Sequence, residues 1–165
     1  MERYYHTIEP IFDQNSKVLI LGTFPSVKSR EAQFYYHHPQ NRFWRVIAQL
    51  TGYPVPESIE DKTKMLLENK IALWDVLASC QIKGSSDSSI RNEEPNDIKI
   101  ILDNAPIRRI FANGDKAYRL YLKHLYKITG AEITRLPSTS PANAAWTMDM
   151  LIEDWKQILS PIESQ

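Results

Sequence analysis

Four short apolar runs, separated by segments with helical spacing, constrain the fold of this chain more than any other feature. The runs cover residues 17–22, 71–77, 108–113 and 132–136. Strands that alternate with helices are typical of a parallel sheet, because parallel strands need crossover connections. The expected helices cover residues 42–51, 57–69, 96–104, 114–126 and 141–159. This pattern predicts an α/β fold, a three-layer α/β/α sandwich around a four-stranded parallel sheet.

Length and composition limit the domain organisation and the compartment. A chain of 165 residues with 42% hydrophobic residues can bury one core and is too short for two ordinary domains, so residues 1–165 are expected to form a single domain. Its one cysteine, Cys80, cannot form an internal disulfide or supply a zinc site alone, which favours the reducing cytoplasm. No run approaches the roughly 18 apolar residues that span a bilayer, so no membrane partner is expected.

The charge balance gives no support for a nucleic-acid partner by itself. The chain carries 20 basic and 20 acidic side chains, so any binding of DNA must depend on local patches. Two groups of basic residues could form such patches. They are Lys28, Arg30, Arg42 and Arg45 in the first part of the chain, and Lys116, Arg119 and Lys123 on a later helix. Ordinary solvated faces are the favoured explanation of both groups.

The end of the first predicted strand is the best candidate for a ligand pocket. The strand is followed by the tight turn Gly22-Thr23-Phe24-Pro25-Ser26. Open α/β sheets bind ligands at the carboxyl ends of their strands, so this turn is expected to line a pocket. Asp75 ends the second predicted strand and would aim its carboxylate at the same crevice. A buried hydrogen bond to a neighbouring loop would explain Asp75 as well.

An aromatic segment follows this turn in the sequence. Phe43 and Trp44 lie on a predicted helix face and are expected to close the core. Tyr36 lies in the turn before Pro39, a better position for stacking on a planar base. Tyr36 is therefore added to the expected pocket.

Asn41 directly precedes the first long predicted helix. Its side chain could cap that helix. Alternatively, its amide carbonyl could orient a water molecule below a scissile bond, close to the positive end of the helix dipole. An amide does not deprotonate water efficiently, so this second role suits a reaction whose transition state is already cationic.

A second motif lies where the last predicted strand ends and the last predicted helix begins. Its sequence is Leu136-Pro137-Ser138-Thr139-Ser140-Pro141-Ala142-Asn143. Small hydroxyl residues and backbone N–H groups at a helix N-terminus can bind phosphate. Ser140 as the N-cap would explain part of the pattern without a ligand.

Several familiar chemistries have no signature in the sequence. There is no Gly-x-x-x-x-Gly-Lys phosphate loop, no Gly-x-Gly-x-x-Gly turn, no His-Glu-x-x-His pair and no nucleophile elbow. The adjacent His37 and His38 would point apart, so they do not make a metal site alone. No metal and no cofactor is expected.

Taken in order, these motifs resemble the uracil-DNA glycosylase superfamily. Within it, they are similar to the hypoxanthine-DNA glycosylases, also called DNA-deoxyinosine glycosylases. Related branches carry a catalytic asparagine or aspartate in the first turn, where this chain has Phe24. That departure fits the hypoxanthine branch, in which the position matching Asn41 supplies the catalytic asparagine.

The resemblance also implies the remaining roles. Gly22, Thr23, Phe24, Pro25, Ser26, Tyr36 and Asp75 would form the base pocket, with Tyr36 stacked on the extruded base. Pro137, Ser138, Thr139, Ser140 and Asn143 would form the loop that grips the DNA backbone and enters the helix. The implied enzyme is a monomer that acts on double-stranded DNA containing a deaminated base. It would leave an abasic site without cutting the strand.

Two other functions remain open at this point. Uracil or another mismatched pyrimidine could be the main substrate, because pocket size does not follow from sequence. A non-catalytic α/β module that binds a nucleotide or a protein would suit the neutral charge. The convergence of the candidate residues on one predicted sheet edge argues against the module.

Overall fold

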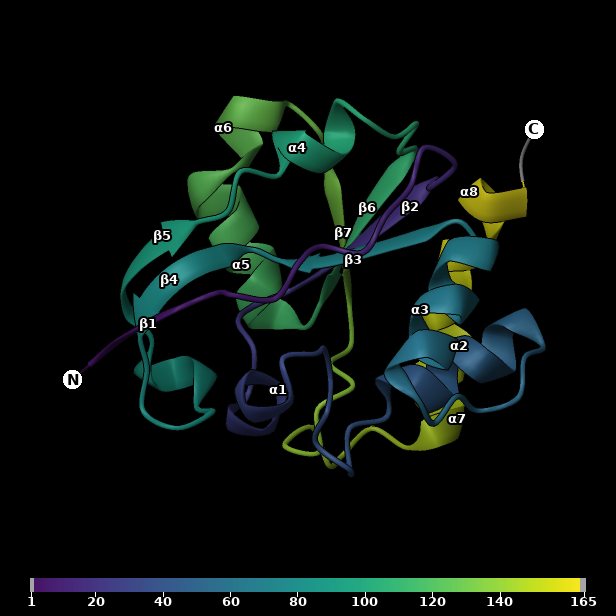
Figure 1. Cartoon of the computed structure of the whole chain (residues 1–165), viewed down its shortest axis with the longest axis horizontal. Helices are drawn as coiled ribbons and strands as arrows, with labels where there is room; N and C mark the ends of the chain where they lie inside the picture. Colours follow the sequence, from purple (N-terminus) through teal and green to yellow (C-terminus); the bar gives the residue numbers. More distant parts are fainter. Residues whose placement is uncertain (1, 164–165) are drawn as a thin grey trace.

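The computed structural model describes residues 2–163 and contains the predicted parallel sheet (Figure 1). Its strands are β2 (Val18–Gly22), β3 (Ile71–Asp75), β6 (Arg109–Asn113) and β7 (Ile133–Leu136). They lie in the order β3-β2-β6-β7, and every neighbouring pair is parallel. Every residue of β2 and β3 is buried, as expected for a sheet covered on both faces.

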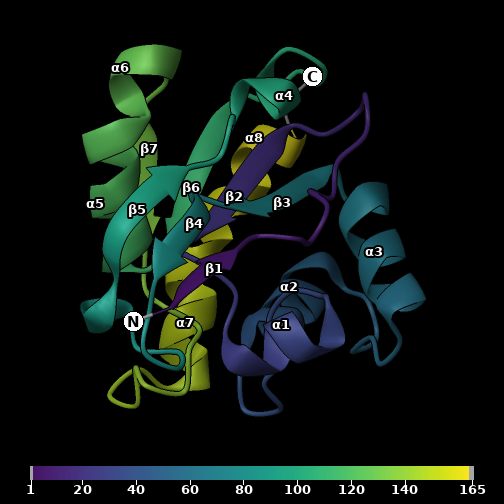
Figure 2. The ribbon, with the colours of Figure 1, turned by 60° about the vertical axis from the view of Figure 1, so that its left-hand side comes forward.

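Helices cover both faces of this sheet, as the three-layer prediction requires. One side carries α2 (Phe43–Thr51), α3 (Ile59–Glu68), α7 (Met148–Trp155) and α8 (Leu159–Glu163). The other side carries α5 (Asp115–His124) and the short α6 (Tyr126–Thr129) (Figures 1 and 2). Trp155 and Phe43 are buried between the sheet and its helices, with ring centroids 5.9 Å apart.

A second, antiparallel sheet was not predicted. Its strands are β1 (Arg3–Tyr5), β4 (Leu77–Gln81) and β5 (Arg91–Pro95), in the order β1-β4-β5. The predicted strand 71–77 therefore divides at Val76, where the chain leaves the parallel sheet. The predicted loop 81–94 contains the 3₁₀ turn η1 (Asp87–Ser89) and most of β5. The residues of β5 do not alternate between apolar and polar, so they did not predict a strand. The segment becomes a strand by pairing with β4.

Three helices also differ from the sequence prediction. Helix α1 (Val27–Ala32) was missed, and α4 (Lys99–Leu102) is shorter than the expected helix 96–104. The helix expected over residues 141–159 begins at Met148, as α7, because Thr147 is the N-cap of α7. The Thr147 side chain accepts a hydrogen bond from the Met150 backbone N–H at 3.2 Å. The residues before Thr147 form a loop. This loop carries the second motif to the end of the sheet.

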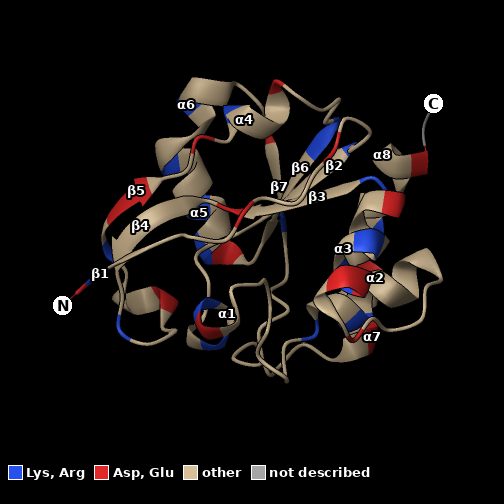
Figure 3. Ribbon diagram, viewed as in Figure 1, with Lys and Arg blue, Asp and Glu red and all other residues tan. Residues whose placement is uncertain are grey.

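Acidic and basic residues are interspersed along the ribbon (Figure 3). Arg119 pairs with Asp115 at 2.7 Å, and Lys123 pairs with Glu93 at 2.8 Å, so part of the later basic group is neutralised. Across the described residues, no helix has the length and apolar character needed to cross a membrane.

Candidate active site

A cavity of about 370 Å³ opens at the carboxyl ends of β2, β3 and β6. This volume suits a small ligand such as a nucleobase. Eleven of the predicted site residues line it: Gly22, Thr23, Phe24, Pro25, Ser26, Tyr36, Asn41, Asp75, Ser138, Thr139 and Ser140. Pro137 and Asn143 lie instead in an adjoining hollow that shares Ser138 and Ser140 with the cavity. The structure therefore brings the two motifs together.

Gly22 is the floor of this cavity. The register of β2 and β3 places Gly22 directly opposite Asp75. A Cβ atom on Gly22 would lie 2.4 Å from Asp75 Oδ1 and 2.8 Å from Tyr36 Oη. Any side chain at this position would displace both groups, so glycine permits the two polar atoms to approach the same point.

Tyr36 has a strained backbone and an unpaired hydroxyl. Its φ of 49° lies in the left-handed region, and its ring stacks on Phe43 with centroids 4.3 Å apart. Phe43 therefore covers part of the ring that was expected to stack on a base. Oη is buried and has no hydrogen-bond partner among the described residues. Burial raises the pKa of this phenol well above its usual value, and the nearby Asp75 carboxylate raises it further.

The Asn41 side chain is fixed by two hydrogen bonds. Its Oδ1 accepts from the Phe43 backbone N–H at 2.9 Å, which satisfies a free donor at the start of α2, and from Thr139 Oγ1 at 2.9 Å. Asn41 therefore satisfies a donor at the start of α2, as the capping hypothesis required, although the residue at the N-cap position is Arg42. Both lone pairs of Oδ1 are occupied, so the predicted contact from the carbonyl to a water is not favoured. Nδ2 is the atom left available, since it has no partner among residues 2–163.

Asn113 holds the second motif and was not predicted as a site residue. Its Oδ1 accepts from the Thr139 N–H at 3.0 Å, and its Nδ2 donates to Thr139 Oγ1 at 3.0 Å. The Thr139 hydroxyl can then donate only towards Asn41, and Thr139 is fully buried. Asn113 ends β6 as Asp75 ends β3, so the strand-end argument could have identified it.

The backbone of the second motif is occupied by its own contacts. The Ser140 N–H donates to Ser138 Oγ, and the Ala142 N–H donates to Ser140 Oγ, both at 3.1 Å. These two N–H groups are therefore not available to a phosphate, and the expected phosphate site stays a prediction that depends on the serine hydroxyls. Each of the two serine oxygens accepts from the backbone, and neither O–H donates to another of the described residues, so both can donate to a ligand. Ser140 does not cap the last helix, whose N-cap is Thr147.

Arg42 anchors the loop after this motif. Its guanidinium donates to the carbonyl oxygens of Ser140 and Asn143, both at 3.1 Å, and to that of Trp146. Asn143 Nδ2 donates back to Ser138 O at 3.0 Å. Arg42 was considered for a basic DNA-binding patch, but its side chain is engaged inside the protein.

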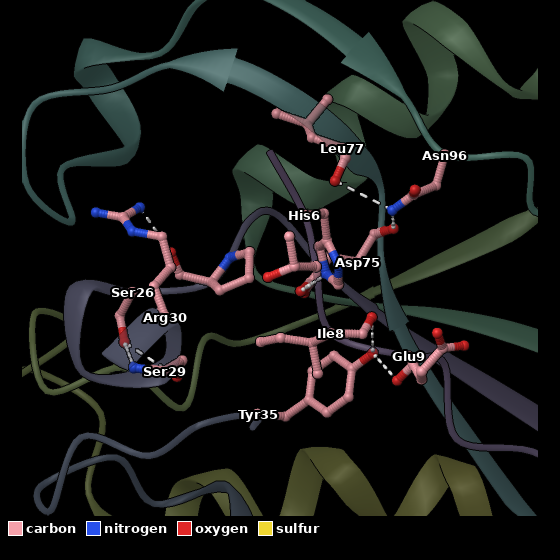
Figure 4. Close-up of polar contacts among 12 residues, drawn as sticks. His6, Ile8, Glu9, Ser26, Ser29, Arg30, Tyr35, Asp75, Leu77 and Asn96 are labelled. Carbon is pink, nitrogen blue, oxygen red and sulfur yellow. Dashed lines mark hydrogen bonds and ion pairs between the residues drawn. The ribbon is translucent and has the colours of Figure 1, made fainter. Parts of the chain in front are cut away.

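Asp75 is paired with a histidine that the sequence did not reveal. His6 Nε2 lies 2.8 Å from Asp75 Oδ2, and the two side chains are only 1% and 5% exposed (Figure 4). Asn96 Nδ2 donates to the Asp75 carbonyl oxygen at 2.9 Å. The two functions considered for Asp75 thus coexist, since its carboxylate makes a buried hydrogen bond and also lines the cavity. His6 gave no local signal, because it reaches Asp75 only through the pairing of β1 with β4.

The 3₁₀ turn η1 brings a further carboxylate to the cavity. Asp87 lines its rim, and the surrounding loop is tied to α1 by the 2.9 Å hydrogen bond from Val27 N to Ser85 Oγ. Although the residue as a whole is exposed, desolvation of the carboxyl group raises the pKa of Asp87 to about 6. Lys116 opposes this shift, and Asp75 adds to it.

The described residues contain no group of three or more His, Cys, Asp or Glu side chains placed to hold a metal ion. The polar side chains around the cavity are amides, hydroxyls, carboxylates and the imidazole of His38. Such groups can bind the edge of a base and hold a water molecule.

Comparisons with known proteins show the family of this chain. The model of the uracil DNA glycosylase superfamily matches residues 9–159. A protein of Methanosarcina acetivorans named hypoxanthine DNA glycosylase is 37% identical over 150 residues, which is 90% of this chain and 93% of that protein. A protein of the same name from Methanosarcina barkeri is 34% identical over 81% of this chain and 85% of its own length.

A solved structure shares the fold. It is the solution NMR structure of a Methanosarcina acetivorans protein provisionally assigned as a uracil DNA glycosylase. The TM-score is 0.81 and the identity 35%, over 95% of this chain and 97% of the other. The resemblance stated from the motifs is thereby confirmed. This chain belongs to the uracil DNA glycosylase superfamily, in the family of proteins named hypoxanthine DNA glycosylase.

Proposed function

We propose that this protein is a DNA glycosylase that hydrolyses the N-glycosidic bond of a deaminated base, hypoxanthine, in double-stranded DNA. The observation that carries this proposal is the convergence of Asn41, Asp75 and the Ser138-Thr139-Ser140 motif on one cavity, in a chain of this superfamily. The product is an abasic site in an uncut strand. One site per molecule suffices for this reaction, so we propose that the protein acts as a monomer. Its single cysteine, Cys80, favours the reducing cytoplasm as its compartment.

The base must leave the duplex before it can react. A base inside the stack cannot reach a cavity in the protein, so the nucleotide flips outward at a cost of a few kcal/mol. Hypoxanthine pairs weakly with its partners, which lowers this cost. In the proposed complex, the free O–H groups of Ser138 and Ser140 donate to the DNA phosphates on either side of the flipped nucleotide.

The cavity supports a dissociative hydrolysis. Departure of the base leaves an oxocarbenium-like sugar, and the DNA phosphates stabilise its positive charge. Asn41 lines the cavity, and its Nδ2 holds a water by a hydrogen bond to one lone pair of the water oxygen, while the other lone pair bonds to the anomeric carbon. The base has left with the electron pair of the N-glycosidic bond, and it takes up the proton that the added water releases. The water needs little activation, because the sugar is already cationic; an amide is therefore adequate. No lysine nucleophile takes part, so the strand stays intact.

Excision assays test this proposal directly. Labelled duplexes with hypoxanthine, uracil or no lesion are incubated with the protein and then treated with alkali, which cleaves abasic sites. We expect cleavage at hypoxanthine. Asn41→Ala should lower excision by about 100-fold or more while DNA affinity stays within a few-fold, since the water is lost and the backbone contacts remain.

The matched control is Asn104→Ala, which removes an exposed asparagine just after α4 whose side-chain amide donates to the Ile100 carbonyl oxygen of that helix. This variant should retain full activity. Full activity of Asn41→Ala would exclude the proposed role of Asn41. Cleavage at uracil alone would replace the proposed substrate.

A further inference from the structure

Two polar atoms at the cavity floor have unused hydrogen-bonding capacity. Asp75 Oδ2 is bound by His6, and Asp75 Oδ1 has no partner among the described residues. Tyr36 Oη is buried and also unpartnered within residues 2–163. Both atoms approach the point where a Cβ of Gly22 would stand, and all three residues line the cavity. A buried hydroxyl without a partner, such as that of Tyr36, is costly, so this arrangement indicates a ligand.

The two atoms offer different chemistry. The Asp75 carboxylate can only accept a hydrogen bond, and its other oxygen already takes the N–H of His6. The Tyr36 hydroxyl can donate, and the raised pKa of Tyr36 keeps it protonated at every physiological pH. An acceptor beside a donor is complementary to a lactam edge, in which a ring N–H lies next to a carbonyl oxygen.

We propose that Asp75 and Tyr36 are the specificity-determining residues and read the lactam edge of a flipped 6-oxopurine. Asp75 Oδ1 accepts from the ring N1–H, and Tyr36 Oη donates to O6. This inference rests on the proposed glycosylase function and specifies how its substrate is chosen. Phe43 holds the Tyr36 ring by stacking, and Gly22 leaves the space into which the edge fits.

His6 is a positioning residue, because it orients the Asp75 carboxylate. Its ring is 1% exposed and is packed edge-on against Phe24 and Trp74, with centroids 6.1 and 6.2 Å away. The ring therefore cannot follow Asp75 if the carboxylate turns. The Nε2–H bond to Oδ2 leaves Oδ1 as the oxygen available to the base.

This arrangement separates hypoxanthine from adenine. Adenine carries a lone pair at N1, which would face the Asp75 carboxylate and be repelled. The Tyr36 hydroxyl can rotate to accept from an amino group, so Asp75 provides most of the selectivity. Guanine shares the lactam edge; its strong pairing in the duplex excludes it at the flipping step.

Changes in the base test the proposal without altering the protein. Single-turnover excision is measured on duplexes that contain hypoxanthine, 1-methylhypoxanthine or adenine at one position. Loss of a hydrogen bond to a charged group predicts excision about 10- to 100-fold slower for 1-methylhypoxanthine, because its N1 has no hydrogen to donate. Binding of the same bases on uncleavable 2′-fluoroarabino nucleotides should show the same preference.

Variants then assign the preference to residues. In Asp75→Ala, which also makes room for the methyl group, the two oxopurines should be excised at rates within about threefold of each other. His6→Phe should lose the same discrimination, while His6→Gln, which keeps an N–H donor, should retain part of it. Tyr36→Phe should slow the excision of hypoxanthine by about 5- to 10-fold.

Tyr121→Phe is the matched control, because it removes a buried hydroxyl that bonds to Ala131 O at 2.7 Å, outside the cavity. This variant should not alter the preference for hypoxanthine over 1-methylhypoxanthine. A variant that only loosens the fold should slow the excision of every base by the same factor.

Two results would overturn the inference. If the wild-type protein excises hypoxanthine and 1-methylhypoxanthine at equal rates, the lactam reading is wrong and the glycosylase proposal stands. If it excises no base and binds the three uncleavable duplexes with equal affinity, both proposals fail.

Discussion

At the scale of single residues, the site depends on a chain of hydrogen bonds that fixes one amide. Asn113 binds both the N–H and the hydroxyl oxygen of Thr139, and the Thr139 hydroxyl donates to Asn41 Oδ1. The motifs identified Asn41 and Thr139 from sequence, but nothing local predicted which atom of the Asn41 amide would remain free. That depends on the hydroxyl of Thr139, 98 residues away in the chain.

Thr139→Val tests this chain of hydrogen bonds. Valine keeps the shape of threonine but removes the hydroxyl, so Asn41 loses one partner and Asn113 Nδ2 is left buried without an acceptor. We expect excision to fall by about 10- to 100-fold and the free energy of unfolding to fall by about 1–3 kcal/mol. Thr139→Ser keeps the hydroxyl and should retain most activity. Single-turnover kinetics and thermal unfolding measure both effects, and a fully active Thr139→Val would contradict the role of the hydroxyl.

At the scale of elements, the parallel sheet was predictable and the loops that complete the site were not. The four buried strands follow from their apolar runs, because each run is short and lies between helical segments. Strand β5 and the loop before α7 were not predicted, since their structure comes from contacts with distant segments. Arg42 gives the clearest example: its guanidinium binds three carbonyl oxygens of the loop that was read as the start of a helix.

Arg42→Gln should loosen this loop. Glutamine cannot reach the same carbonyl oxygens as a guanidinium, so the hydroxyls of Ser138 and Ser140 should lose their fixed positions. We expect DNA affinity to fall by about 5- to 20-fold, corresponding to about 1–2 kcal/mol. Arg45→Gln is the matched control on the same helix, because Arg45 is exposed. Fluorescence anisotropy with a labelled duplex measures both, and equal affinity losses in the two variants would mean that only charge matters.

At the scale of the whole molecule, ion pairs join the antiparallel sheet to the helices of the main sheet. Glu93 on β5 contacts Lys123 at 2.8 Å and His124 at 2.9 Å on α5. Partial burial would raise the pKa of Glu93, but the hydrogen bonds from Lys123 and His124 outweigh it and lower the pKa to about 2. This contact could not be predicted, because the residues of β5 have no strand-like pattern.

The depressed pKa makes this contribution to stability dependent on pH. The stabilisation is fully present above the unfolded pKa of about 4.5 and is lost as the pH falls towards about 2. Because Lys123 is largely exposed, solvent screening limits the contribution to on the order of 1 kcal/mol. Glu93→Gln should therefore be less stable at pH 7, and its difference from the wild type should shrink below pH 4.5. Urea unfolding at pH 7 and pH 3 measures this, and a constant difference would contradict it.

The most direct test of the central claim is to identify the products of the reaction. A duplex with one hypoxanthine is incubated with the protein, and mass spectrometry of the untreated mixture follows the free base and both strands. The account predicts free hypoxanthine and a full-length strand with one abasic site. A duplex that stays intact, or a strand that is cut without alkali, would contradict it.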